Sequence, residues 1–218
     1  MGSNLNLNYQ IEEYINSHSI KLHPVQYEII KYNETLGEIK KMQISISQCH
    51  FLHLIVKIIK PKNILEIGTF TGLSALTMGL AMDENSKLTA LDKNKETSDV
   101  AMSFFKKAKI DNKINLLINN AIVSLEDLCN QKKKFDFIFI DADKENYINY
   151  FNNSLNILNN NGIIVVDNVL WYGDVADQNK NDRLTLKIRE FNKFIKDDNR
   201  VESLILPIGD GLSVCRKI

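Results

Sequence analysis

The chain has 218 residues, 44% hydrophobic and 25% charged, which suits one α/β domain with a sizeable core and is short for two. Its 27 Lys and Arg balance 27 Asp and Glu, so the net charge gives no general attraction to nucleic acid or to a membrane surface. No stretch approaches the ~20 apolar residues of a membrane span, and the N-terminus has no signal-peptide pattern. The three scattered cysteines, Cys49, Cys129 and Cys215, lack metal-binding spacing and predict reduced, mostly buried thiols in the cytoplasm.

In chain order, residues 1–60 are predicted to be a helical segment that packs on the same domain as 61–218. Pro24 suits the first turn of one helix, and Ser45 or Ser47 suits the N-cap of another. Short apolar strands then alternate with helices. The expected strands cover 62–68, 87–92, 113–119, 135–141 and 162–168. The expected helices cover 71–82, 95–109, 121–131, 144–160 and 182–198. Residues 201–218 predict a hairpin around "GDG".

This alternation predicts a parallel sheet covered by helices on both faces. With the closing antiparallel hairpin, the architecture is a three-layer, Rossmann-like α/β fold of about seven strands. Ligands of such sheets bind beyond the carboxyl ends of the strands. The sequence "FIFIDADKE" places charged residues at such an end, so we interpret it as part of a site rather than as a solvated turn.

A glycine turn follows the first of these strands. Glu66, Gly68 and Gly72 form an ExGxxxG pattern that opens a helix, and Asp92 ends the next strand. A carboxylate at that place can accept both hydroxyls of a ribose. The turn lacks the GxGxxG spacing of a pyrophosphate site, and Glu66 suits a ligand with an amine, so S-adenosylmethionine fits better than NAD. A structural turn beside a solvated Asp92 is the alternative.

Two further strand ends carry oxygen ligands. Asp141 follows "FIFI", and Asp167 with Asn168 follows "IIVV". If these strands are neighbours, two carboxylates and an amide oxygen converge, a set that suits a hard divalent cation such as Mg²⁺ or Ca²⁺. The alternative is two unrelated turn aspartates.

Several ordered segments resemble the cation-dependent O-methyltransferases of the caffeoyl-CoA and catechol type. They are "MQIS", "ILEIGTFTGLSAL", "LTALDKN", "FDFIFIDADKENYINY", "GIIVVDNVLWYGDV" and "LPIGDGLSVCRKI". The resemblance runs from about residue 23 to the C-terminus. It implies a homodimeric S-adenosylmethionine-dependent methyltransferase with Mg²⁺, Ca²⁺ or Mn²⁺ on Asp141, Asp167 and Asn168. It also implies a cofactor site made by Ile44, Glu66, Gly68, Thr69, Ser74, Asp92, Ala121 and Asp143.

The expected reaction is methyl transfer to a hydroxyl of a small aromatic acceptor, catechol-like or phenylpropanoid. The cation on Asp141 would activate the hydroxyl, and Lys144 would take its proton or hold the oxyanion. Trp171 and, more weakly, Tyr172 are candidates for walls of the acceptor site. A surface lysine and a core tryptophan are the simpler alternatives.

The chain departs from the family pattern at two places. Ile44 stands where some relatives have Thr, so it can offer only its backbone, and "SISQCHF" replaces "SPEQGQF". Leu184 and Ile188 stand where plant members carry tyrosines, which argues against a caffeoyl-CoA acceptor. Three other functions stay open: a nicotinamide oxidoreductase, a tRNA hydroxyuridine O-methyltransferase, and a non-catalytic S-adenosylmethionine-binding protein.

Overall fold

The computed structural model describes residues 8–218. Its centre is a seven-stranded sheet with the order β3-β2-β1-β4-β5-β7-β6. The strands are β1 (Asn63–Ile67), β2 (Lys87–Asp92), β3 (Ile114–Ile118), β4 (Phe135–Ile140), β5 (Leu158–Val166), β6 (Val201–Leu206) and β7 (Leu212–Lys217). Strands β1 to β5 are parallel, and β7 is antiparallel to both β5 and β6. This confirms the predicted α/β fold with its C-terminal antiparallel hairpin.

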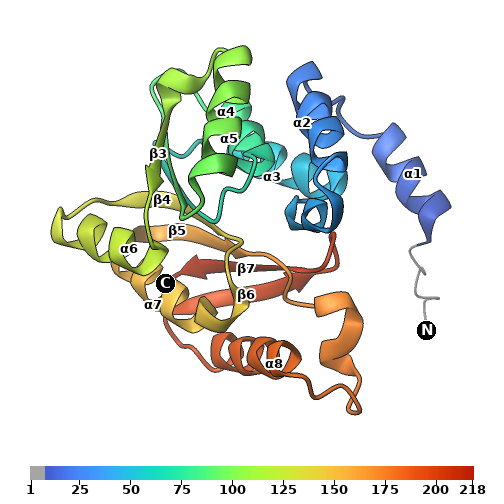
Figure 1. Cartoon of the computed structure of the whole chain (residues 1–218). Coiled ribbons are helices and arrows are strands. Elements are labelled where there is room, and N and C mark those ends of the chain that lie inside the picture. The colour runs from blue at the N-terminus through green and yellow to red at the C-terminus, as the bar shows by residue number, and fades with distance from the viewer. Residues whose placement is uncertain (1–7) are drawn as a thin grey trace.

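Helices cover both faces of the sheet. The α-helices are α1 (Tyr9–Ser17), α2 (Pro24–Glu34), α3 (Ile46–Ile59), α4 (Leu73–Ala81), α5 (Lys95–Lys107), α6 (Ala121–Asn130), α7 (Tyr147–Ile157) and α8 (Arg183–Lys196). Short 3₁₀ helices are η1 (Gly37–Met42), η2 (Asp111–Lys113), η3 (Lys144–Asn146) and η4 (Trp171–Ala176). Helices α2 to α5 lie on one side of the sheet and α6 to α8 on the other (Figure 1). Residues 1–7 of the predicted N-terminal segment lie outside the described residues.

The side chains of each buried strand alternate between two hydrophobic layers. In β4, Phe137 and Phe139 pack in the layer under α2 to α5, whereas Ile138 and Ile140 pack in the layer over α6 to α8. Successive strand residues point to opposite faces of a sheet. Continuing this alternation past the end of β4 places the next side chain, Asp141, on the side of α2 to α5.

Local signals in the sequence account for most element boundaries. Pro24 occupies the first turn of α2, and Ser45 rather than Ser47 caps α3. The expected helix 144–160 was too long, because α7 ends at Ile157 and β5 begins at Leu158. Leu158 is buried and pairs with Phe135, and the asparagines that follow it are poor helix formers.

Of the three cysteines, all free thiols, Cys49 and Cys215 are buried as predicted. Cys129 is exposed, so two of the three are buried, which agrees with the expectation of mostly buried thiols. It lies near the end of α6, on a helix whose buried residues are Ser124, Leu125 and Leu128.

The segment Gly37–Ile59 contains an 18-residue window with a mean hydropathy of 1.3, apolar enough on composition for a membrane span. The chain divides it into two helices, because Gln43 and Ser45 adopt extended backbone between η1 and α3. Helix α3 has 14 residues and is therefore ~21 Å long, shorter than the ~30 Å hydrocarbon core of a bilayer. One face of α3, with Leu52 and Val56, lies in the protein core.

Candidate active site

The carboxyl ends of three central strands lie level at one edge of the sheet. Ile67 of β1 pairs with Ile140 of β4, which pairs with Val166 of β5. The pattern continues one residue further: Asp141 N donates to Ile67 O, and Asp167 N donates to Ile140 O, both at 2.9 Å. The two aspartates are therefore neighbours across strands, as the sequence predicted.

Gly68 brings the glycine turn into contact with the end of β4. Its φ is +93°, and a Cβ atom at this position would lie 2.1 Å from the backbone oxygen of Asp141. Neither the conformation nor the contact admits a side chain. The sequence pattern that contains Gly68 therefore joins the predicted cofactor turn to the predicted metal site.

Glu66 is a fully buried carboxyl in this turn. It has no exposed surface, and neither of its oxygens has a hydrogen-bond partner among the described residues. Burial raises the pKa of Glu66 to about 8, although the hydroxyls of Ser74 and Thr69 act to lower it. A buried polar group without a partner is costly, so the site suits a ligand that brings a cation or hydrogen-bond donors to Glu66.

Asp92 lies against the same turn. Its Oδ2 accepts from the backbone N–H groups of Thr69 at 3.0 Å and Phe70 at 2.7 Å. Its Oδ1 accepts from Asn94 N at 2.8 Å. The carboxylate thus fixes the turn to the end of β2 while it stays partly exposed. Binding of a ribose by Asp92 stays a prediction.

The remaining predicted cofactor residues are more widely placed. Ala121 begins α6 after β3, at the same end of the sheet as Asp92. Asp143 is exposed, and its carboxylate accepts hydrogen bonds from Tyr150 Oη at 2.6 Å and Asn146 Nδ2 at 2.5 Å, on the side of α7. The side chain of Ile44 is 4% exposed and packs in the core, which leaves only its backbone for a ligand.

Lys144, Asp141 and Asp167 form a largely buried charged cluster at this edge of the sheet. Lys144 Nζ lies 3.0 Å from Asp141 Oδ1, and both side chains are only 14% exposed. Burial lowers the pKa of Lys144, but Asp141 and Tyr147 together outweigh this effect and the net pKa is raised. Asp167 is 2% exposed, and burial, reinforced by the charge of Asp141, raises its pKa to about 8.

Two further residues contact Asp167, and sequence reasoning missed both. Gln48 Nε2 donates to Asp167 Oδ1 at 2.6 Å, and Tyr147 Oη donates to the Asp167 backbone oxygen at 2.9 Å. Lys144 Nζ lies 5.3 Å from the centre of the Tyr147 ring. The motif Ser45-x-x-Gln48 is visible in the sequence as a helix cap, but a second partner of Gln48 is not.

The loop after β5 carries the predicted acceptor residues in unusual backbone. Asn168, Trp171 and Tyr172 have φ of 56°, 49° and 56°. Residues other than glycine rarely adopt a positive φ, and those that do are often found at functional sites. Tyr172 is 74% exposed, and its ring centre lies 5.5 Å from that of Trp171.

Asp210, in the hairpin turn "GDG", holds this loop and was also missed by the sequence reading. Its Oδ1 accepts from Tyr172 N at 2.5 Å, and Asn168 Nδ2 lies 3.5 Å from its Oδ2. Partial burial raises the pKa of Asp210. The glycines on either side of it had suggested only a hairpin turn.

Within residues 8–218, no three His, Cys, Asp or Glu side chains gather as a metal site. The predicted metal-binding set has only two carboxylates, and its third member is an amide.

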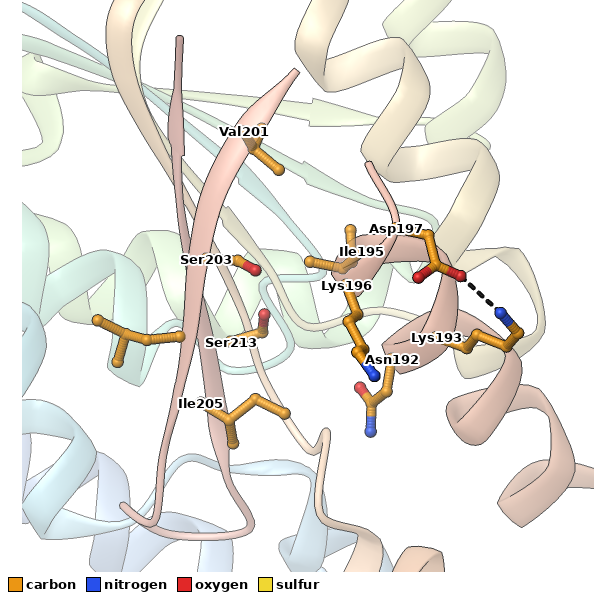
Figure 2. Close-up of a pocket in the computed structure, with 10 residues that line it drawn as sticks. Asn192, Lys193, Ile195, Lys196, Asp197, Val201, Ser203, Ile205 and Ser213 are labelled. Carbon is orange, nitrogen blue, oxygen red and sulfur yellow. Dashed lines mark hydrogen bonds and ion pairs between the residues drawn. The ribbon is translucent and has the colours of Figure 1, made fainter. Parts of the chain in front are cut away.

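A hollow of about 720 Å³ lies between α8 and the β6–β7 hairpin, where Ser203 and Ser213 face Asn192 and Lys196 (Figure 2). None of the predicted site residues lines it.

The profile of the O-methyltransferase family matches residues 16–218. The chain belongs to the O-methyltransferase family. This confirms the predicted enzyme class, an S-adenosylmethionine-dependent O-methyltransferase, and removes the nicotinamide alternative.

Individual relatives cover most of the chain. It is 37% identical to the caffeoyl-CoA O-methyltransferase of Populus kitakamiensis, over 84% of this chain and 81% of that protein. It is 36% identical to the flavonoid 3',5'-methyltransferase of Vitis vinifera, over 81% of this chain and 79% of that protein. The solved O-methyltransferase of Bacillus cereus in complex with SAH matches with a TM-score of 0.88 and 29% identity, over 96% of this chain and 97% of that one.

Proposed function

We propose that this enzyme methylates one hydroxyl of a small catechol-like or phenylpropanoid acceptor, held by a divalent cation on Asp141, Asp167 and Asn168. One observation carries the proposal. Two carboxylates meet at neighbouring strand ends, one of them, Asp167, 2% exposed, and the Lys144 ammonium contacts only the other, Asp141. A divalent cation would favour the ionised form of Asp167 and compensate the charge of the two carboxylates.

The cofactor would lie along the glycine turn. Glu66, buried and without a partner, suits the ammonium group of S-adenosylmethionine, and the hydroxyls of Thr69 and Ser74 border it. Asp92 would accept the ribose hydroxyls. The Bacillus cereus relative was solved with SAH, the product of such a transfer, which supports this placement.

The donor set suits a hard cation. Carboxylate and amide oxygens are the ligands that Mg²⁺, Ca²⁺ and Mn²⁺ prefer, and Asn168 meets Asp210 through its nitrogen, so that contact leaves its oxygen free. When bound, the cation would act as a Lewis acid that lowers the pKa of the attacking hydroxyl. Asp141 and Asp167 would hold it, and the acceptor would complete its coordination.

Lys144 would act on the acceptor oxygen. The hydroxyl loses its proton, the oxygen attacks the sulfonium methyl carbon, and the carbon–sulfur bond breaks to leave S-adenosylhomocysteine. Lys144 Nζ contacts the Asp141 carboxylate at 3.0 Å as an ammonium group, which supports holding the oxyanion over accepting the proton. The proton would then leave to solvent water. Trp171 and Tyr172 would flank the acceptor ring.

The proposed acceptor is a small molecule rather than an acyl-CoA. The two plant relatives described above are named for different acceptors, caffeoyl-CoA and a flavonoid, and are almost equally identical to this chain. Sequence identity therefore does not indicate which acceptor this enzyme uses. Ile188 of α8 has no exposed surface, although plant members have a tyrosine there. An entirely buried side chain cannot shape an acyl-CoA site, which supports a smaller acceptor.

The test is methyl transfer from labelled S-adenosylmethionine to catechol, caffeic acid, caffeoyl-CoA and bulk tRNA, each with Mg²⁺ and with EDTA. We expect transfer to catechol or caffeic acid that EDTA stops. Transfer that EDTA leaves intact would overturn the metal assignment. Transfer to tRNA alone would favour the hydroxyuridine alternative, and cofactor binding without transfer to any acceptor would favour the non-catalytic one.

We propose further that the enzyme is a cytoplasmic homodimer. Tyr14 on α1 and Leu54 and Ile58 on α3 are at least 59% exposed, and these helices contact each other. Leu54 and Ile58 lie one turn apart on α3, and exposed apolar side chains on one helix face are typical of interfaces. Light scattering on purified protein should give twice the monomer mass, and Ile58→Glu should shift it to the monomer; cell fractionation tests the location.

A further inference from the structure

Gln48 belongs to a helix cap and to the predicted metal site at the same time. Its Oε1 accepts from the backbone N–H of Ser45 at 2.7 Å, and the Ser45 hydroxyl accepts from Gln48 N at 3.2 Å. This reciprocal capping box begins α3. Because a backbone N–H can only donate, Oε1 must face Ser45, and the amide nitrogen must face Asp167.

The contact fixes one oxygen of Asp167. Oδ1 accepts from Gln48 Nε2 and from the backbone N–H of Asn168, each at 2.6 Å. No hydrogen bond among the described residues reaches Oδ2. Two donors on one oxygen hold the carboxylate plane in place and leave the other oxygen for a ligand.

The hairpin turn prevents Gln48 from moving away. A Cβ atom at Gly209, whose φ is +58°, would lie 2.5 Å from Gln48 Cδ. Gln48 itself is 3% exposed. The amide is therefore held between the start of α3 and the β6–β7 turn, in one orientation.

We propose that Gln48 is a positioning residue that orients Asp167 for the divalent cation. The inference rests on the proposed metal site. It also assigns a function to the start of α3, which would transmit any displacement of residues 44–48 to the metal through one hydrogen bond. Residues that orient metal ligands in this way typically change affinity for the metal by about 10–100-fold.

The chain contains a matched control for this contact. Gln26 occupies the same capping-box position in α2, where its Oε1 accepts from His23 N at 2.8 Å and its Nε2 donates to Thr77 Oγ1 at 2.7 Å. It is 4% exposed, almost the same as Gln48. Gln26→Met and Gln48→Met therefore remove the same cap and a similar buried hydrogen bond, but only Gln48→Met frees a carboxylate of the proposed metal site.

The experiment is Mn²⁺ binding to the full chain, followed by the electron paramagnetic resonance signal of free Mn²⁺, with a thermal melt for each variant. We expect Gln48→Met to weaken Mn²⁺ binding about 10–100-fold, and Gln26→Met to change it by less than about twofold. Equal affinities for Gln48→Met and wild type would overturn the inference and leave the metal site standing. If the wild type binds no Mn²⁺, the proposed metal site fails and the inference fails with it.

A second pair of variants decides the matter if Gln48→Met does not fold. Gly209→Ala would push on the Gln48 amide, whereas Gly37→Ala has a similar φ of +62° and meets nothing within 4 Å. Both carry the same backbone strain. Weaker Mn²⁺ binding by Gly209→Ala alone supports the inference, and equal binding by the two variants contradicts it.

Discussion

Glu66 and Asp167 are two buried carboxyl groups at the same edge of the sheet, and burial raises the pKa of each to about 8. Their surroundings differ. Asp167 Oδ1 already accepts two hydrogen bonds from the protein, whereas neither oxygen of Glu66 has a partner in the part of the chain described. The protein therefore orients Asp167 in advance and leaves Glu66 for the ligand to satisfy. The first is typical of a metal ligand, the second of a group that binds a charged cofactor.

The largest expected effect comes from removing the charge of the pre-oriented group. Asp167→Asn keeps the shape but loses a metal ligand, so we expect turnover to fall by more than about 100-fold and Mn²⁺ binding to be lost. S-adenosylhomocysteine affinity, measured by calorimetry, should stay within about threefold. Glu66→Gln is the matched variant: it should keep Mn²⁺ binding and weaken the affinity for S-adenosylhomocysteine. The same pattern in both variants would remove the distinction between the two groups.

The next largest effect is expected for Lys144, because its ammonium group contacts Asp141, one of the proposed metal ligands. Lys144→Met should lower kcat by about 100-fold or more and change the cofactor affinity little. Lys41 also pairs with a carboxylate three residues away, Glu38, but on the surface, so Lys41→Met is the control and should leave kcat unchanged. A loss of cofactor affinity larger than the loss of kcat would contradict the assigned role.

The sequence predicted the carboxyl groups at the strand ends better than the residues that contact and orient them. The positions of Glu66, Asp141 and Asp167 were predictable because each lies at or just after the carboxyl end of a buried apolar strand, and parallel strands end at one edge of a sheet. Gln48 and Asp210 were not, since their partners are far away in the chain and their own motifs, a capping box and a "GDG" turn, have sufficient local explanations. Side chains that orient a site across long sequence distances leave no local pattern.

The fold shows the same limit. Alternation of apolar runs and helices predicted every strand of the sheet and the closing hairpin. It placed the start of β5 too late, because Leu158 enters the sheet through pairing with Phe135, a tertiary contact that overrides the apparent helical pattern of 144–160.

Glu66 also predicts a pH dependence of stability without bound cofactor. Its folded pKa of about 8 exceeds its ordinary value of 4.5, so between these values the folded state retains a proton that the unfolded state has lost. The wild-type free energy of unfolding should therefore fall as pH rises through this range and level off above about 8. Glu66→Gln lacks this slope and should be more stable than wild type at pH 8, by on the order of a few kcal/mol.

Chemical denaturation at several pH values measures this difference. The two proteins should converge near pH 4.5 and separate steadily toward pH 8. Parallel curves with a constant separation would show that the Glu66 carboxyl is not the titrating group, and would weaken its contrast with Asp167.

The smallest expected effect refines the account of Glu66. Among the groups that lower the pKa of Glu66, the Ser74 hydroxyl has the largest effect and the Thr69 hydroxyl the next largest. Ser74→Ala should raise that pKa further, so the stability slope should extend to higher pH, with a change of about 1 kcal/mol or less at pH 8. In the double variant with Glu66→Gln the Ser74 effect on the slope should vanish, because no carboxyl remains to titrate. A slope that Ser74→Ala leaves unchanged would mean that Glu66 is without any effective donor until the cofactor binds, which would make its contrast with the hydrogen-bonded Asp167 complete.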